Sequence, residues 1–386
     1  MSANPLDNIR VEITDLDKEL LRLLARRRAL VREVASIKTE HGIPLRDKNR
    51  ENELLSHLIR LGQEKALDSH FILDIFHRII DDSLLVQQSF LQNIITADNK
   101  ADIRVSHLGE EGAYSYLAAE KHFATASKSV HHVGCDDFSE VIGQVKEHQA
   151  DVAMLPIENT TSGGINEVYD LLIDCSLSIV GEELLKIEHC LIAKPGVSLE
   201  QIDTVLAHPQ AKTQCHKTLK KLGITNAEFV NSTAHALQLV QGDERTNIAA
   251  IAGHETAALY NLRVLAKDLA DQTGNYSRFV VLAPHPQPVH QSLPCKTTLM
   301  LATKQKAGAL VDALTVFQNY SINLTKLESR PIIGNPWEEM FYIDLDGNIA
   351  DQPVAEAIDQ LTQMCRFVKV LGSYPSADRE TTVVDL

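Results

Sequence analysis

A basic residue interrupts the apolar face of the first long helix pattern. Apolar residues recur there in steps of three and four, as in a helix that packs on other helices, at Ile9, Ile13, Leu16, Leu20, Leu23, Leu30, Val34 and Ile37. Arg27 stands where another apolar residue is expected, and Lys38 follows eleven positions later on the same face, about 16 Å along the axis. A lone arginine usually extends into solvent, but two cations on one apolar face can together hold a small anion.

A second helix pattern has polar residues on its apolar face. Its stripe from Ile72 to Ile79 continues into Ser83 and Gln87, although unpartnered polar groups are costly in a core. Between the two patterns lies the charged segment 46–51. We therefore predict a polar pocket between helices, where helical bundles commonly hold their ligands.

Three polar loops occur in the middle of the chain. The first, at 156–164, joins a strand pattern to a helix pattern, so its backbone N–H groups favour an anion; an ordinary helix cap would explain the same residues. It lacks the Gly-Lys-Ser/Thr of a nucleotide loop. The others are 207–210 and 275–279. Loops at sheet edges can converge on a cleft between two lobes.

Three kinds of structure must position these residues. Helical periodicity predicts an all-helical start, with helices at 6–40, 48–62 and 68–95. Short β-rich runs alternating with helical patterns predict a parallel-sheet α/β domain in two lobes, with strands at 104–108, 151–155, 204–206, 248–251 and 278–282. The βαββαβ order at 297–371 is that of the ferredoxin-like α+β fold. Polar residues 96–102 and the proline-rich 284–288 are typical of linkers.

Composition narrows the class of protein. The chain has 386 residues and a formal charge of −15, which disfavours nucleic acid or an anionic membrane as partner. No apolar run approaches the roughly 18 residues of a membrane span, and the start does not resemble a signal peptide. The six cysteines form no CxxC pair, so we expect neither a disulfide framework nor a zinc site. We expect a cytoplasmic protein without metal or cofactor.

Residues 6 to about 91 resemble the all-helical chorismate mutase domain at the front of fused P-proteins. The resemblance implies that chorismate is bound by Arg10, Arg27, Lys38, Asp47, Arg50, Glu51, Ser83 and Gln87. Arg10 and Arg27 are seventeen positions apart on one helix, about 25 Å, which is too far for one small substrate. If both touch one ligand, Arg10 comes from a second chain, as in the family's intertwined dimer.

The implied reaction converts chorismate to prephenate by an intramolecular rearrangement. It requires a dicarboxylate held in a compact pose and stabilisation of charge on the breaking ether oxygen. Arginine forks suit the carboxylates. We expect Lys38, Gln87 and Glu51 to be catalytic, with Glu51 acting directly only if it is protonated or linked through water.

Residues 104 to 284 resemble the prephenate dehydratase domain, and Pro-Ile-Glu-Asn-Thr at 156–160 is the most specific part. The family's fold is two α/β lobes around a cleft, like a periplasmic binding protein. The resemblance implies that prephenate is bound by Glu158, Asn159, Thr160, His208, Gln210, Gln214 and Arg278. Two positions depart from the family's pattern: Ser277 replaces its usual threonine, and Ala207 replaces a frequent serine.

The implied second reaction removes a hydroxyl and a carboxylate from prephenate to give phenylpyruvate. We expect Ser277 to give a proton to the leaving hydroxyl; because serine is a weak acid, neighbours or water must share the work. Arg278 either binds a carboxylate or stabilises its loop.

Residues 297 to 376 resemble an ACT regulatory domain of the phenylalanine-sensing kind. The resemblance implies inhibition by phenylalanine at a dimer interface, bound by Gly308, Ala309, Leu310, Val311, Glu328, Ser329, Arg330 and Pro331. Such control requires a ligand that prefers one of two global states. The single tryptophan, Trp337, would report binding by fluorescence.

The expected division is a mutase domain at 1–91, a linker at 92–103, a dehydratase domain at 104–284, a linker at 285–296, an ACT domain at 297–376 and a tail at 377–386. A fusion to prephenate dehydrogenase is disfavoured, because Gly109-Glu110-Glu111-Gly112 lacks the dinucleotide-binding spacing. A non-catalytic amino-acid-responsive binding protein remains compatible with a cleft plus an ACT domain, although the polar breaks in the helices count against it.

Overall fold

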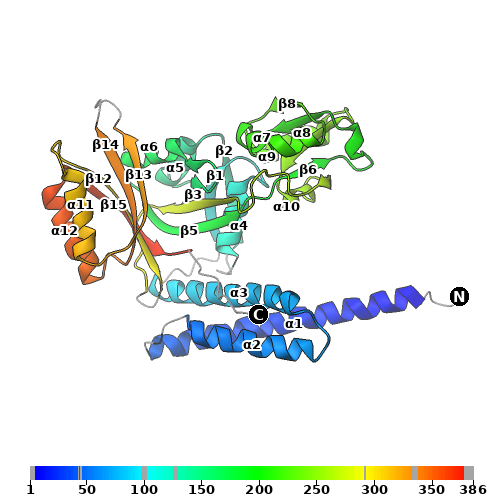
Figure 1. Cartoon of the computed structure of the whole chain (residues 1–386), viewed down its shortest axis with the longest axis horizontal. Coiled ribbons are helices and arrows are strands. Elements are labelled where there is room, and N and C mark those ends of the chain that lie inside the picture. The colour runs from blue at the N-terminus through cyan, green and yellow to red at the C-terminus, as the bar shows by residue number, and fades with distance from the viewer. Residues whose placement is uncertain are drawn as a thin grey trace. The chain divides into compact units, whose positions relative to one another are not determined.

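The computed structural model describes residues 5–41, 43, 46–96, 102–124, 129–290, 293–332 and 338–377. These form two compact units, one of helices and one containing three sheets (Figure 1). Trp337 and residues 97–101 of the predicted linker at 92–103 lie outside the described residues, and the rest of that linker belongs to a helix and a strand.

The helical unit has the three predicted helices, with bounds close to those expected: α1 (Pro5–Glu40), α2 (Lys48–Gln63) and α3 (Ser69–Thr96). The Asp47 side chain caps α2 by accepting from the Arg50 backbone N–H at 3.0 Å. Leu55, Leu73, Ile80 and Leu84 form the buried contact between α2 and α3.

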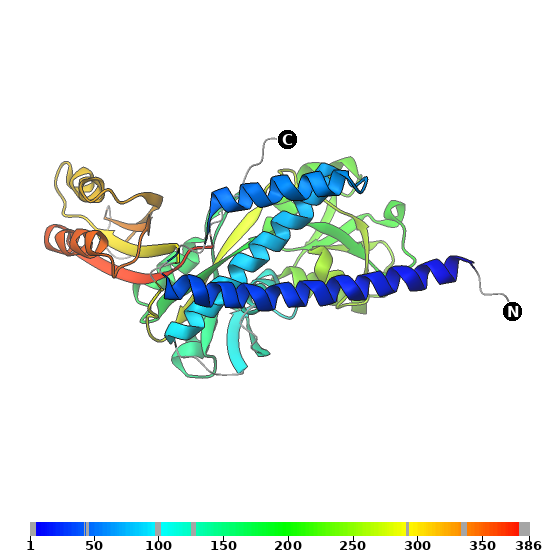
Figure 2. The ribbon, with the colours of Figure 1, turned by 90° about the horizontal axis from the view of Figure 1, so that it is seen from below.

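The apolar stripe of α1 is largely uncovered. Ile9, Leu16 and Leu20 are 55%, 61% and 58% exposed. The N-terminal half of α1 extends beyond the other two helices (Figure 2), since α1 has 36 residues and α2 only 16. The periodicity correctly predicts a helix with an apolar face, but this single chain does not bury that face.

The second unit begins with a lobe built on a six-stranded sheet. Its path is β2-β1-β3-β11-β5, and β4 pairs with β3. Its strands are β1 (Asp102–Leu108), β2 (Ser129–Cys135), β3 (Val152–Asn159), β4 (Gly163–Gly164), β5 (Ser178–Lys186) and β11 (Tyr276–Ala283). Its helices are α4 (Tyr114–Phe123), α5 (Phe138–Lys146) and α6 (Asn166–Ile173). Buried residues of α4 pack on one face of the sheet, while α5 and α6 pack on the other.

The next lobe contains a five-stranded sheet in the order β10-β6-β9-β7-β8. Its strands are β6 (Cys190–Ala193), β7 (Thr204–Ala207), β8 (Asn226–Phe229), β9 (Ile248–Ala252) and β10 (Arg263–Ala266). Its helices are η1 (Leu199–Gln201), α7 (Pro209–Gln214), α8 (His216–Lys221), α9 (Thr233–Gly242) and α10 (His254–Ala257). The chain enters this lobe after β5 and returns to the first lobe through β11.

The expectation of parallel sheets is wrong in part. β1, β2 and β3 are parallel, but β11 runs antiparallel to both β3 and β5. In the other lobe, β6 is antiparallel to β9 and β10. The reason is the returning chain: β11 enters the first sheet from the second lobe, so no crossover helix sets its direction.

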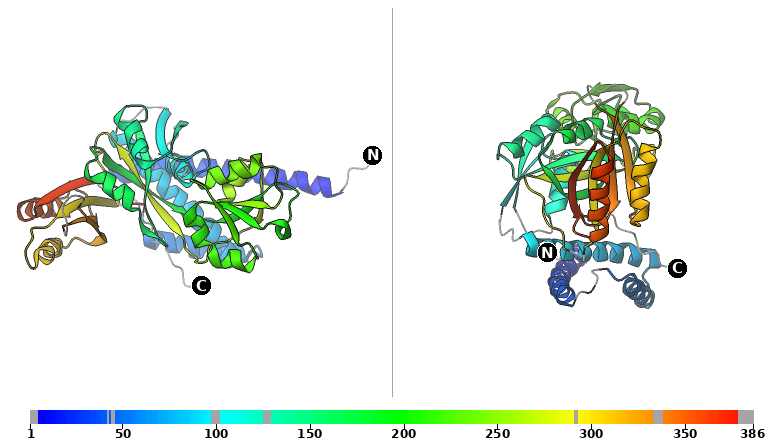
Figure 3. Two further views of the ribbon diagram at one scale, coloured as in Figure 1. Left: turned by 90° about the horizontal axis from the view of Figure 1, so that it is seen from above. Right: turned by 90° about the vertical axis from the view of Figure 1, so that its left-hand side faces the viewer.

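The C-terminal part has the predicted βαββαβ order. Its sheet runs β13-β14-β12-β15, with β12 (Cys295–Ala302), α11 (Ala309–Asn319), β13 (Leu324–Pro331), β14 (Glu339–Asp346), α12 (Gln352–Met364) and β15 (Phe367–Pro375). α11 and α12 lie side by side (Figure 3), and their buried residues pack against those of the sheet.

The four-stranded sheet packs directly on the first lobe. Met300, Tyr342 and Tyr374 share a buried cluster with Ile179 and Leu282 of β5 and β11. Gly372 of β15 lies so close to β5 that a Cβ there would be 2.0 Å from the Ile179 carbonyl oxygen. Only glycine permits this approach, so the C-terminal sheet and the first lobe form one body.

Candidate active sites

In the helical unit, Arg27 turns toward α3. Its Nη1 donates to the Ile79 carbonyl at 3.2 Å and to the Ser83 hydroxyl. Burial lowers the pKa of Arg27 from its ordinary value. Ser83 and Gln87 are each 6% exposed, so the polar breaks predicted on the two helix faces meet each other.

Gln87 leaves one polar atom unsatisfied. Its Nε2 donates to the Ser83 carbonyl at 3.2 Å, but its buried Oε1 has no hydrogen-bond partner among the described residues. A buried acceptor without a donor is costly, which fits a position next to a bound molecule.

The start of α2 brings charged residues toward Lys38. Glu51 is 8% exposed and accepts from Arg46 at 3.1 Å. Burial lowers the pKa of Lys38, although the charges of Asp47 and Glu51 oppose this shift. Arg50 is exposed and lies 3.7 Å from Glu53. Lys38, Asp47 and Glu51 are therefore close in space, as predicted.

Arg10 lies apart from these groups. Its side chain is 68% exposed and pairs with Asp7, one turn earlier, at 3.4 Å. The helical rise places it about 25 Å from Arg27. Within one chain, Arg10 and Arg27 cannot hold the same small molecule.

The second unit contains a cavity of about 420 Å³ lined by both lobes, a volume typical of small-molecule sites. Five predicted residues line it: Asn159, His208, Gln210, Gln214 and Ser277. They come from β3, α7 and β11 with their flanking loops, so the three polar loops converge as expected.

Glu158 and Arg278 do not line this cavity; they face the C-terminal sheet. On β11, Ser277 and Arg278 are consecutive and point to opposite faces. On β3, the register pairs Glu158 with Arg278 and Pro156 with Phe279, leaving Ile157 as an extra residue. Such a bulge redirects the residues next to it, so Glu158 turns from the cavity while Asn159 enters it.

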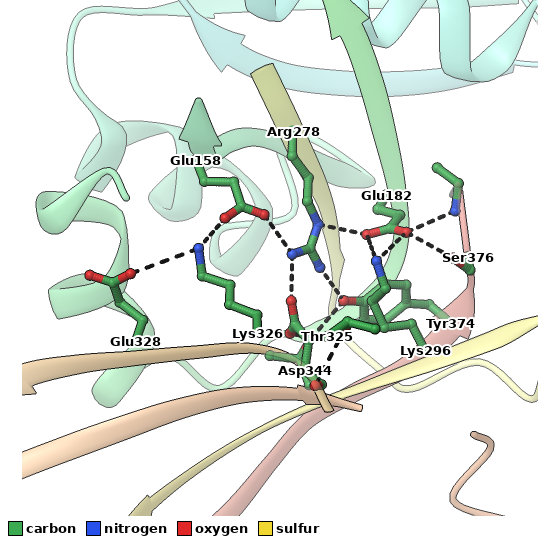
Figure 4. Close-up of polar contacts among 12 residues, drawn as sticks. Glu158, Glu182, Arg278, Lys296, Thr325, Lys326, Glu328, Asp344, Tyr374 and Ser376 are labelled. Carbon is green, nitrogen blue, oxygen red and sulfur yellow. Dashed lines mark hydrogen bonds and ion pairs between the residues drawn. The ribbon is translucent and has the colours of Figure 1, made fainter. Parts of the chain in front are cut away.

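A buried charge cluster holds Glu158 and Arg278 (Figure 4). Arg278 pairs with Glu182 at 2.6 Å, with Glu158 at 2.9 Å and with Asp344. Burial tends to lower the pKa of Arg278, but Tyr374, Glu182 and Asp344 outweigh it and raise that pKa. Lys326 of β13 reaches Glu158, and Lys296 of β12 reaches Glu182 at 3.2 Å. Arg278 thus contacts two strands of the first lobe and the C-terminal sheet, an arrangement that neither of its two predicted roles describes.

Thr160 also acts within the protein. Its hydroxyl donates to the Gly274 carbonyl at 3.0 Å and accepts from the Tyr276 N–H at 2.9 Å. It thus fastens the loop after β3 to the segment before β11, next to the cavity rather than in its lining.

Five helices begin at the cavity wall. Residues at the starts of α4, α5, α6, α7 and α9 line it, including Ala113, Tyr114, Ser115, Asp137, Phe138, Ile165, Glu167, His208, Gln210, Ser232 and Thr233. Helix starts carry partial positive charge and free N–H groups, and α4 and α6 have no side-chain cap. None of the described lining residues is lysine or arginine, and Asp136, Asp137 and Glu167 are acidic. An anion in this cavity would have backbone N–H groups and neutral polar side chains as its donors.

Three residues that hydrogen bonds link to Ser277 through Gln214 and Asn159 were not predicted as site residues: Tyr114, His189 and Asn275. His189 and Asn275 are 2% and 3% exposed. Asn275 is the first residue of the polar loop 275–279, so the sequence could have identified it as a site residue. His189 precedes β6 where the chain passes between lobes, and no sequence pattern marks it. Burial lowers the pKa of both His189 and His208, which favours their neutral forms.

The segments predicted to bind phenylalanine lie at α11 and on β13. Gly308 has φ of 80°, which favours glycine, and Val311 is 66% exposed. On the edge strand β13, Arg330 pairs with Asp170 of α6 at 2.9 Å, whereas Leu327 is 45% exposed. Alternate residues of β13 therefore face the first lobe and solvent.

Among the described residues, no cluster of His, Cys, Asp and Glu has the geometry to bind a metal ion. A search of the same residues found no helix with the length and apolarity needed to span a membrane.

Comparison with known proteins finds matches for both parts of the chain. Residues 9–88 match the model for chorismate mutase type II, and residues 105–287 match that for prephenate dehydratase. The bifunctional chorismate mutase/prephenate dehydratases of Enterobacter agglomerans and Escherichia coli (strain K12) are each 45% identical, covering 97% of this chain and 96% and 97% of theirs. The crystal structure of prephenate dehydratase in complex with L-Phe from Arthrobacter aurescens has 30% identity and a TM-score of 0.65, covering 73% of this chain and 93% of that one. The chain therefore belongs to the bifunctional chorismate mutase/prephenate dehydratase family.

Proposed function

We propose that the helical unit converts chorismate to prephenate and that the cavity of the second unit converts prephenate to phenylpyruvate. Family membership over 97% of the chain supports both activities. The observation that carries the second is the Ser277 hydroxyl in a two-lobed cavity, where its oxygen accepts from Asn159 Nδ2 at 3.0 Å. That donor occupies a serine lone pair and leaves the O–H free to act on a substrate.

In the mutase reaction, the protein orients chorismate and stabilises charge. Arg27 and Lys38 attract the carboxylates and the developing negative charge on the ether oxygen. The side-chain amide of Gln87 adds a polar group beside these two cations. Glu51 accepts from Arg46, so we assign it to holding that arginine and the local charge rather than to direct donation.

The exposed face of α1 indicates how the mutase site is completed. Its uncovered apolar stripe would be buried by a second copy of the same helix, which would also bring a second Arg10 to the site. We therefore propose a homodimer with shared mutase sites. In a dimer with twofold symmetry, each of the two sites would contain Arg27 of one chain and Arg10 of the other.

In the dehydratase reaction, helix N-termini hold the carboxylates of prephenate, since the described lining residues include no lysine or arginine. The ring hydroxyl leaves as water, taking the Ser277 proton. The ring carboxylate departs as carbon dioxide, and the electrons of its broken bond complete the aromatic ring. A solvent proton then restores Ser277. The protein contributes orientation and proton transfer.

We propose that the C-terminal βαββαβ domain is an ACT domain that binds phenylalanine through the segments 308–311 and 328–331. The solvent-facing residues of β13 are available to a ligand or a second copy, whereas Arg330 holds α6. We also place the protein in the cytoplasm, where chorismate and prephenate would be its small-molecule partners and no cofactor is needed.

The experiment supplies chorismate to the full chain and follows prephenate and phenylpyruvate, with and without phenylalanine. Phenylpyruvate should form without added cofactor, and phenylalanine should slow it while changing Trp337 fluorescence. Unchanged chorismate would remove the first activity, and prephenate as the final product would remove the second. Binding of phenylalanine without turnover would favour the non-catalytic alternative.

A further inference from the structure

Two backbone N–H groups fix the orientation of the Asn159 amide. Thr161 and Ser162 donate from their backbone nitrogens to Asn159 Oδ1 at 3.0 and 3.1 Å. A backbone N–H can only donate, so the oxygen must lie on that side. On the other side, Asn159 Nδ2 lies 3.0 Å from both the Tyr276 carbonyl and Ser277 Oγ.

This orientation determines the next two amides. Asn159 Nδ2 lies 2.7 Å from Asn275 Oδ1, so Asn275 presents its own nitrogen to Gln214 Oε1 at 3.1 Å. The Gln214 oxygen is therefore an acceptor. Its nitrogen donates to Thr161 Oγ1 at 2.7 Å.

The Gln214 oxygen in turn determines the tautomer of a histidine. His189 Nε2 lies 2.7 Å from Gln214 Oε1 and must carry the hydrogen. His189 Nδ1, 3.1 Å from the Tyr114 hydroxyl, is then free to accept. Burial, together with repulsion from His208, lowers the pKa of His189 although Gln214 opposes this, and a neutral imidazole has only one N–H.

We infer that neutral His189, protonated on Nε2, is a positioning residue for the dehydratase reaction. It acts through Gln214 of α7, which belongs to the second lobe, on the loop of Asn159 and on Ser277 in the first lobe. The hydrogen atoms point toward Ser277 along the path through Thr161, whose hydroxyl donates to Asn159 Oδ1 at 2.6 Å, whereas those of Asn159 and Asn275 run back to Gln214 Oε1. Hydrogen bonds in a series such as the Thr161 path reinforce one another. The inference rests on the proposed dehydratase function.

His189 stands at the place where such a residue can coordinate the two lobes. It lies between β5 of the first lobe and β6 of the second, and Tyr114 at the start of α4 contacts its other nitrogen. Without the N–H of His189, the Gln214 side-chain amide loses one of the hydrogen bonds that fix its orientation. The effect should appear in the chemical step, because a displacement of about 1 Å in a catalytic group can cost about a hundredfold in rate.

The test compares His189→Leu with His189→Gln in the full chain, with prephenate as substrate. Glutamine places an amide N–H near the position of Nε2, whereas leucine places none. We expect His189→Leu to lower kcat at least about tenfold with KM changed less than about threefold, and His189→Gln to recover most of the loss. His107→Leu is the matched control, since His107 is 1% exposed, lies in the same unit and does not line the cavity. It should keep wild-type kcat.

Several kinetic outcomes would overturn the inference. Wild-type kcat in folded His189→Leu would show that the N–H is dispensable. A raised KM with unchanged kcat would make His189 a substrate contact. Equal losses in the leucine and glutamine variants would assign the effect to the imidazole as acid or base.

A second readout does not depend on turnover. Nitrogen-15 spectra of histidine-labelled full chain, assigned by subtraction of the His189→Gln spectrum, should show neutral His189 with hydrogen on Nε2 at pH 7. An Nδ1–H tautomer or an imidazolium would overturn the inference even if the wild-type chain did not consume prephenate. Failure of the wild type to consume prephenate would instead count against the proposed function.

Discussion

Ser277 and Arg278 show how far single residues can be predicted from a motif. Both stand in one polar loop, and the sequence correctly marked that loop as converging with those of Asn159 and His208. It did not show which face each side chain takes, because this depends on strand alternation and on the extra residue Ile157 in β3. The result is a hydroxyl in the cavity and, one position later, a buried cation facing another domain.

At this scale, we predict a pH-dependent effect for Glu158→Gln. Burial tends to raise the pKa of Glu158, but Lys326 and Arg278 outweigh it and hold the pKa below the ordinary 4.5. The stabilisation from its ionised form is therefore present above pH 4.5 and lost as pH falls through the lowered pKa. The variant should be less stable at pH 7 by about 1–2 kcal/mol.

Urea unfolding followed by circular dichroism at several pH values tests this. The difference from wild type should shrink as the pH falls below 4.5. Glu228→Gln is a suitable control, because its pair with Arg245 is exposed and should contribute little. A Glu158→Gln difference that is constant with pH, or no larger than that of the control, would contradict the assignment.

Among the elements, periodicity located the three helices and the βαββαβ order within a few residues, because local spacing determines which face of each element can be buried. The direction of β11 could not be predicted, since the path of the chain through another lobe sets it. For α1, the sequence correctly predicts a helix with an apolar stripe. It does not show what covers that stripe, and the single chain leaves it exposed.

For α1, we predict complementation between two inactive variants. If Arg10 acts in the partner's site, Arg10→Ala and Lys38→Ala should each lose mutase activity by about a hundredfold or more. A mixed dimer has one site with both substitutions and one intact site. Co-expressed chains that pair at random should therefore recover about a quarter of wild-type activity.

The activity of co-purified mixed dimers, isolated with two different tags, measures this directly and should reach about half of wild type. As controls, dimers of each single variant that carry one copy of each tag are purified and assayed in the same way. Inactive mixed dimers would place Arg10 and Lys38 in the same chain's site, and a monomeric protein would exclude shared sites altogether.

At the scale of the whole molecule, the buried charge cluster joins the dehydratase sheet to the C-terminal sheet. Arg278, Lys296 and Lys326 meet Glu158, Glu182 and Asp344, and Lys326 also lies 3.9 Å from Glu328. Removing one member leaves a buried charge without its counterpart. The cluster makes the two domains energetically dependent on each other.

We therefore expect Asp344→Asn to destabilise the second unit by about 3–5 kcal/mol. Asp312→Asn, which removes an exposed pair with Lys306, should cost less than about 1 kcal/mol. The urea concentrations at which the two variants are half unfolded provide the comparison. Equal values would mean that water or a rearrangement of side chains compensates the charge that Asp344 leaves unpaired.

The most direct measurement for the account as a whole follows Ser277→Ala with chorismate as the only substrate, corrected for the uncatalysed reaction. Chorismate should disappear at the wild-type rate and prephenate should accumulate, with phenylpyruvate formation reduced by about a hundredfold or more. Ser277→Thr should form phenylpyruvate normally, because it keeps the hydroxyl. Phenylpyruvate formed at the wild-type rate by Ser277→Ala would contradict the proposed chemistry of the cavity.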